Sequence, residues 1–230
     1  MRIARRYNGP ATSANGGVAS GRLAEYVGAA AVQVTLRRPP PLDVDLRVDA
    51  AGGTARLLHG DALVAEAVPG RLAADPGPSQ DLGAGADPGA AVTVEQGTAA
   101  EFGYAGLSDH PFPTCFVCGT ERDDGLGLRP GPLGDGRVGC VWTPAADDRW
   151  LVWAALDCPG GWSTDLPGRP MVLGRMILER YGAPSVGEPH VVVGWTTGTE
   201  GRKTFTGTAL FDGEGAVVAR AQATWIALAR

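Results

Sequence analysis

One carboxylate in this sequence has mainly apolar neighbours. Asp157 follows the run WLVWAAL and precedes Cys158. A carboxylate is rarely buried unless it is paired or functional, because removing its charge from water is costly. Asp157 is therefore a candidate for acid–base or nucleophilic chemistry. The structural alternative is a helix cap. Pro159 would kink a helix that continued through it, so a helix beginning at Pro159 could be capped by Asp157.

Four cysteines form the second group of chemically active residues. Cys115 and Cys118 form a CxxC motif, which is a pattern for zinc or redox chemistry in an intracellular chain. Zinc would need two further ligands in a close second cluster, whereas Cys140, Cys158 and His110 are scattered along the sequence. A thioredoxin-like site would need a helix beginning at the motif, and the polar residues that follow do not favour one. We therefore expect reduced structural thiols, no metal and no cofactor.

Composition excludes several classes of function. The 230 residues carry a formal net charge of −5, and 44% of them are hydrophobic, which is enough to bury a core. An acidic chain offers no basic field to gather phosphates, so nucleic-acid binding is not expected. No apolar run is long enough for a membrane-spanning helix. The N-terminal MRIARRYNGP lacks the apolar segment of a secretory signal, so we expect a cytoplasmic protein.

The two halves of the chain share a plan, in which a helical segment precedes strand-like runs separated by glycine-containing turns. In the first half we expect a helix at 15–30 and strands at 31–38, 43–50, 53–60 and 62–68. In the second half we expect a strand at 136–144, a helical or buried run at 150–158, and strands at 172–182, 189–201, 203–215 and 216–228. The pattern is typical of a duplicated α+β unit, with an unrelated pair of α+β domains as the alternative.

Residues 73–112 separate the two halves. They are rich in Gly, Pro and Ala, and a structureless stretch of this length is uncommon inside one compact domain. We therefore expect an N-terminal unit at 1–72, a linker at 73–112 and a C-terminal unit at 113–230. The AVTVEQG run at 91–97 could add one short edge strand.

The segment CFVCGTERDDGLGLRPGPLGDGRVGCVWTP (115–144) places a CxxC motif, an acidic turn and GLGL before a strand. It resembles the opening of many hotdog-fold thioesterase relatives, in which a long antiparallel sheet wraps around a central helix. The Gly-Gly turn and the run VTLRRPPPLDVDLRV of the first half are similar to the N-terminal unit of double-hotdog acyl-CoA thioesterases. The resemblance implies an α+β fold of two tandem hotdog units and a CxxC that does not bind a metal.

The resemblance also implies a site. Single-domain hotdog thioesterases carry His-Gly-Gly at the start of the helix and an acidic residue about two turns later. The glycine N–H at the positive helix end polarises the thioester carbonyl, and the carboxylate attacks it or activates water. Here Gly16 occupies the turn but Ala24 the acid position, whereas the second half has Asp157 at the acid position and no glycine turn. The two halves would thus build one complete site, with Gly16 facing Asp157.

Further residues follow from the same resemblance. Asn15 would orient the turn or cap the helix, and Gln222 on the last strand would position water. Gly17, Trp153 and Trp162 would contact the substrate. In another register, Pro159-Gly160-Gly161 forms the turn and Asp165 becomes an acid early in the helix.

The function implied by the resemblance is hydrolysis of an acyl thioester. Acyl-CoA is preferred over acyl carrier protein, because an acidic carrier would need a basic patch and the sequence shows only scattered arginines. The alternative is a non-catalytic acyl-CoA-binding or scaffolding protein on the same fold. Exposed sheet edges would allow a homodimer.

Overall fold

The structure, a computed structural model, describes residues 1–73 and 90–229. The first half contains α1 (Gly16–Ala24), β1 (Ala31–Leu36), β2 (Arg47–Ala51), β3 (Thr54–His59) and β4 (Ala62–Pro69). The second half contains α2 (Val94–Glu101), β5 (Gly131–Pro132), β6 (Val138–Trp142), α3 (Leu151–Trp162), β7 (Met171–Arg180), β8 (His190–Glu200), β9 (Lys203–Phe211) and β10 (Val217–Ala227). Two single-turn 3₁₀ helices lie at Arg5–Tyr7 and Ala105–Leu107.

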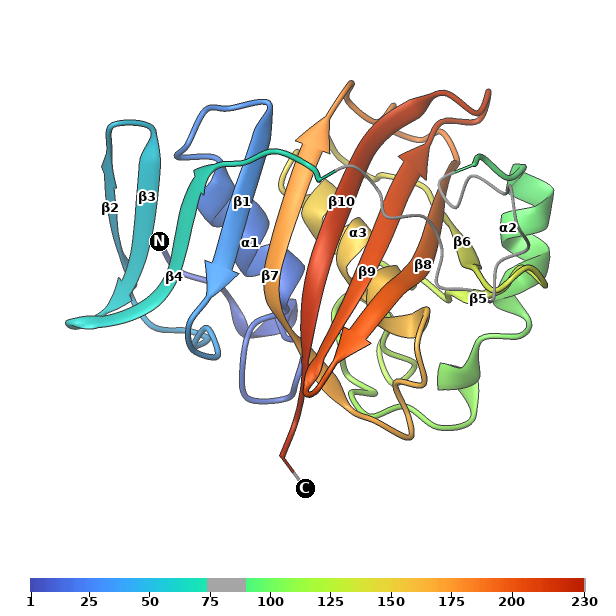
Figure 1. Cartoon of the computed structure of the whole chain (residues 1–230), viewed down its shortest axis with the longest axis horizontal. Helices are drawn as coiled ribbons and strands as arrows, with labels where there is room; N and C mark the ends of the chain where they lie inside the picture. Colours follow the sequence, from blue (N-terminus) through green and yellow to red (C-terminus); the bar gives the residue numbers. More distant parts are fainter. Residues whose placement is uncertain (74–89, 230) are drawn as a thin grey trace.

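All the strands join in one antiparallel sheet, with α1 and α3 packed against each other behind it (Figure 1). The order across the sheet is β2-β3-β4-β1-β7-β10-β9-β8-β6-β5. In each half the first strand after the helix lies beside the last strand, and the other two follow outward. This shared topology confirms the prediction of two tandem α+β units. The two units meet where β1 pairs with β7.

The predicted glycine turns form as expected. Gly52 and Gly53 join β2 to β3 with φ of 59° and 74°, a left-handed conformation that glycine adopts without steric cost. β3 begins with the alternation of a strand with one face on the core, since Ala55 and Leu57 are buried while Thr54 and Arg56 are exposed. The alternation ends at Leu58, which is also buried and lies at a register shift in the pairing with β4.

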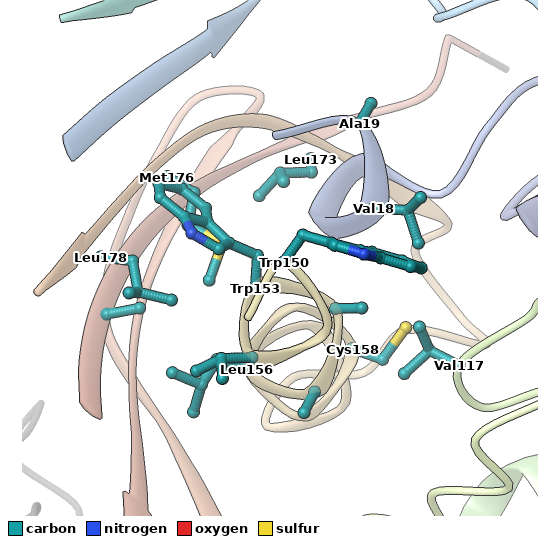
Figure 2. Close-up of a cluster of buried hydrophobic side chains, with 14 of the residues drawn as sticks. Val18, Ala19, Val117, Trp150, Trp153, Leu156, Cys158, Leu173, Met176 and Leu178 are labelled. Carbon is teal, nitrogen blue, oxygen red and sulfur yellow. The ribbon is translucent and has the colours of Figure 1, made fainter. Parts of the chain in front are cut away.

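Helix α3 lies at the centre of the molecule because none of its faces is polar. All of its residues are buried, as expected of a helix that is apolar all round. It contacts β6 to β10 and packs against α1. Figure 2 shows part of this core, in which side chains of α1 and β7 surround those of α3, among them Val18, Ala19, Leu156, Leu173, Met176 and Leu178.

Pro159 lies inside α3, so the alternative in which a helix begins at Pro159 is wrong, and so is the alternative register in which Pro159-Gly160-Gly161 forms a turn. A proline removes one helical hydrogen bond. The helix continues through it because all of its residues are buried by tertiary packing. Beside the proline, the Thr208 hydroxyl of β9 donates to the Leu156 carbonyl at 3.0 Å. Asp157 therefore lies in the middle of a helix and is not a cap.

The edge strand expected at 91–97 is also wrong, because α2 begins there. The Thr93 hydroxyl accepts from the Gln96 N–H, and the Gln96 side chain accepts from the Thr93 N–H. This reciprocal capping box outweighs the β-branched residues of the run. Of the predicted linker, residues 74–89 lie outside the described residues, and 90–112 hold α2 and the second 3₁₀ helix.

The segment after the linker packs back on the first half. The Phe116 N–H donates to the Asn8 carbonyl at 2.7 Å, and the Asn8 side chain donates to the Thr114 hydroxyl. This contact places Cys115 and Cys118 beside the start of α1. None of the described helices has the length and hydropathy needed to cross a membrane.

Candidate active site

The start of α1 is the first part of the site. Asn15 caps the helix, since its side-chain oxygen accepts from the Val18 N–H at 2.9 Å. The next N–H groups are used differently: that of Gly17 donates to Asp157, whereas that of Gly16 has no hydrogen-bond partner among the described residues. The Gly16 N–H is therefore a free donor at the positive end of a helix.

Asp157 is the second part of the site and comes from α3. Its side chain is only 2% exposed. One carboxylate oxygen, Oδ2, accepts from the Gly17 N–H at 2.9 Å and from the Asn15 Nδ2 at 3.0 Å. The other oxygen, Oδ1, is buried and has no partner among the described residues. Burial raises the pKa of Asp157 to about 7, although the Gly17 hydrogen bond works in the opposite direction.

Close packing of the two helices brings these parts together. A Cβ on Gly17 would lie 2.6 Å from the Trp153 carbonyl oxygen and 2.7 Å from the Asp157 Cβ. Gly21, one turn later on the same face, would likewise collide with the Trp150 backbone. Glycine at both positions lets the backbones of α1 and α3 approach closely enough for the Gly17 N–H to reach Asp157.

Asn15, Gly16 and Asp157 open into a cavity of about 610 Å³. This volume lies within the range of small-molecule sites. Most of its wall is apolar and comes from the loops beside α1, from β7 and from β10; examples are Pro10, Pro40, Phe112, Leu173, Trp225 and Ile226.

Three arginines also line this cavity. Arg37 pairs with Glu66, and the Arg202 guanidinium donates to the Ala227 carbonyl. The Arg38 guanidinium has no ion-pair or hydrogen-bond partner within residues 1–73 and 90–229. It is thus a positive group available to a ligand.

The cavity wall also holds three thiols, and their proximity was not predicted from the sequence. Cys115, Cys118 and Cys158 are buried free cysteines whose sulfur atoms all lie within 4.8 Å of one another. Hydrogen bonds from Cys118 and Cys158 hold the pKa of the Cys115 thiol well below its ordinary value. Burial instead raises the pKa of Cys118, and the hydrogen bond with Cys115 raises that of Cys158. Cys140 lies apart from this group.

Of the other predicted site residues, only some line the cavity. Trp162 lines the cavity, and Gly17 touches Asp157 behind it. Trp153 is buried but lines a separate small hollow beside Ala24 and Arg180. Gln222 is not part of the cavity wall, because its side-chain amide pairs with the backbone of Ala73 at 2.9 and 3.0 Å. Asp165 lies beyond α3 and accepts from the Gly168 N–H.

Comparison with known proteins bears on the fold. No protein-family model matches the sequence, and no curated protein is significantly similar to it. Among solved structures, a candidate thioesterase of Novosphingobium aromaticivorans aligns with a TM-score of 0.58 and 13% identity, over 100% of this chain and 94% of the other. The tesB protein of Mycobacterium avium subspecies paratuberculosis aligns with a TM-score of 0.55 and 12% identity, over 94% and 88%.

A third solved structure that aligns with this chain is described as a hotdog fold. A hotdog-fold protein of unknown function from Alicyclobacillus acidocaldarius aligns with a TM-score of 0.54 and 10% identity, over 100% of this chain and 92% of the other. Its likeness spans both halves, in agreement with the repeated topology of the sheet. The chain therefore has the hotdog fold, built as two tandem units.

Proposed function

We propose that this protein hydrolyses an acyl thioester in the cavity between its two halves. One observation carries the proposal: the free Gly16 N–H and the unpartnered Asp157 Oδ1 belong to residues lining the same cavity. An unused donor at a helix N-terminus stabilises developing negative charge on an oxygen. A carboxylate oxygen with no partner can attack a carbonyl carbon or accept a proton from water. Thioester hydrolysis needs both groups.

The reaction then follows from the position of each group. The thioester carbonyl oxygen accepts a hydrogen bond from the Gly16 N–H, which makes the carbonyl carbon more electrophilic. Asp157 Oδ1 either attacks this carbon, giving an anhydride that water opens, or removes a proton from the water that attacks. The thiolate leaves and takes up a proton, and the acid product dissociates. Asn15 and Gly17 hold Oδ2, so that Oδ1 keeps its orientation.

The cavity supports an acyl-CoA substrate. Its apolar wall suits an acyl chain, and the Arg38 guanidinium suits a phosphate of coenzyme A. Two of the solved structures with this fold are named as a candidate thioesterase and as a tesB protein, which agrees with the proposal. In the first half the acid position is Ala24, and Glu25 one residue later is half exposed and pairs with Arg22, so this half offers no second buried acid there.

A non-catalytic acyl-CoA-binding protein is the second candidate. It is favoured by the two hydrogen bonds at Asp157 Oδ2, because a binder would keep this carboxylate paired. Arg38 and the apolar cavity would serve a binder equally well.

A panel of acyl-CoA esters with short, medium, long and aromatic acyl groups separates these candidates. Loss of the thioester absorbance is the better readout, because a thiol reagent would also react with the free cysteines. We expect turnover that saturates with one class of acyl chain. Saturable binding by calorimetry without turnover would favour the binder, and the absence of both would overturn the two candidates together.

Asn15 is a positioning residue in this scheme, and two substitutions separate its roles. Asn15→Ser keeps an oxygen that can cap α1 but removes the amide that donates to Asp157. We expect kcat/KM to fall roughly ten- to hundredfold, because a hydrogen bond to a charged group contributes about 1.5–3 kcal/mol. Asn15→Ala should also lower the free energy of unfolding by about 1 kcal/mol through loss of the cap. Full activity in Asn15→Ser would reduce Asn15 to a cap alone.

A further inference from the structure

The three thiols in the cavity wall have the spacing of a metal site. Cys115 Sγ lies 3.8 Å from Cys158 Sγ, and all three sulfur atoms lie within 4.8 Å of one another. Zinc–sulfur bonds are about 2.3 Å long, so two thiolates of a tetrahedral zinc site lie about 3.8 Å apart. The observed spacing needs only small side-chain movements to reach this geometry. No other group of three or more His, Cys, Asp or Glu side chains comes together in this way within the described residues.

Two elements far apart in the sequence supply these thiols. Cys115 and Cys118 belong to a tight turn in which the Gly119 N–H donates to the Cys115 carbonyl at 2.8 Å. A Cβ on Gly119 would approach that carbonyl oxygen to 2.5 Å, so this turn needs glycine. Cys158 comes from α3, and in Figure 2 it points toward the part of the turn that carries Val117. The turn and the helix thus present their thiols to each other.

The surroundings of the turn fix its position. The Tyr104 hydroxyl donates to the Cys118 carbonyl at 2.9 Å, and the His110 Nε2 lies 3.0 Å from the same oxygen. The other ring nitrogen of His110 accepts from the Phe112 N–H. Both nitrogens of His110 are therefore occupied, which leaves the three cysteines as the ligand set.

A polar group is also available to stabilise thiolates at this place. The Asn15 Nδ2 lies 3.9 Å from the Cys115 sulfur and 3.8 Å from the Cys158 sulfur, within hydrogen-bonding distance of both. Donors of this kind are the usual outer neighbours of metal-bound ligands.

We propose that Cys115, Cys118 and Cys158 bind a zinc ion whose fourth coordination position faces the cavity. All three residues line that cavity, so water or a small ligand can reach the fourth position. Three protein ligands and one open position are the arrangement of zinc sites that exchange a ligand. The proposal does not depend on thioester hydrolysis, since its three ligands have no role in that reaction and its readout is metal binding; Asn15 is the one residue that both proposals use.

Metal binding can be measured directly on the full chain. Protein reduced and stripped with a chelator is titrated with Zn²⁺ in competition with a chromophoric chelator, and separately with Co²⁺. We expect one metal ion per chain and a Co²⁺ complex with thiolate-to-metal absorption and the intense visible bands of tetrahedral cobalt. X-ray absorption of the zinc form should show three sulfur neighbours at about 2.3 Å. A stoichiometry near zero, or a coordination shell without sulfur, would overturn the proposal.

Matched cysteine variants identify the ligands. Cys158→Ser should weaken zinc binding by more than about 100-fold, because even residues outside the ligand shell change affinity by about 10–100-fold. Cys140→Ser is the control, since Cys140 is also buried but lies outside the cluster. Zinc should raise the Tm of the wild type and of Cys140→Ser, but not that of Cys158→Ser. Unchanged zinc affinity in Cys158→Ser would contradict the ligand set, and the absorption spectra of the wild type test it even if this variant fails to fold.

Discussion

Asp157→Asn is expected to reduce acyl-CoA hydrolysis by about 10²–10⁴-fold, the usual contribution of a positioned general base. The amide has nearly the shape of the carboxylate, so Asn15 and the Gly17 N–H retain an oxygen to donate to. It cannot attack the thioester or take a proton from water. The loss should therefore appear in kcat, measured with the best substrate of the panel, whereas KM should change little.

Stability separates a catalytic from a structural role for the same residue. Burial raises the pKa of Asp157 to about 7, so keeping its carboxylate ionised above that pH costs free energy in the folded protein, whereas asparagine carries no charge. We therefore expect Asp157→Asn to retain or increase Tm while activity falls, as happens where a site is kept at the expense of stability.

The matched control is Asp165→Asn, which alters the next acidic residue along the chain. Asp165 follows α3 and accepts a hydrogen bond from Gly168, away from the cavity. We expect its variant to retain wild-type turnover. If Asp157→Asn kept its activity and Asp165→Asn lost it, the position of the acid in our proposal would be wrong.

Gly17→Ala is expected to destabilise the protein by overpacking the contact between α1 and α3. The new methyl group would lie 2.6–2.8 Å from the Trp153 carbonyl, the Ala154 Cα and the Asp157 Cβ. Two of these atoms belong to the backbone of a fully buried helix and cannot move away alone. Overpacking of this kind costs about 1–3 kcal/mol. Urea denaturation should show this loss as a lower midpoint with an unchanged slope.

The same substitution should also reduce activity, because separating α1 from α3 lengthens the Gly17–Asp157 hydrogen bond. Gly182→Ala is the control: its Cβ would meet no atom within 4 Å, and Gly182 does not have positive φ. We expect that variant to differ from wild type by less than about 0.5 kcal/mol. An equally small effect of Gly17→Ala would mean that the two helices can separate without cost.

Local sequence determined much of the fold. The glycine turns, the alternating strands and the apolar run around Asp157 each depend on neighbours within a few residues, and each formed close to its predicted place. The bounds differ most at α1, which ends at Ala24 and not at 30, and at β2, which begins at Arg47 and not at 43. The prediction of an edge strand at 91–97 is wrong for a local reason as well, because the capping box of Thr93 and Gln96 begins a helix there. The repeated order of elements then predicted two tandem units, which the sheet topology confirms.

Tertiary structure alone decided the contents of the cavity. The sequence suggested that Gly16 would face Asp157, but the hydrogen bonds from Asn15 and Gly17 depend on how closely two helices pack, and they join residues about 140 positions apart. Cys158 reaches Cys115 and Cys118 for the same reason, although the distance between them along the chain does not indicate a shared cluster. Gln222 shows the converse, because a suitable residue type on the last strand is directed to Ala73. Periodicity and turn chemistry are local properties of the chain, whereas side chains from distant elements meet only where the packing of a whole core brings them together.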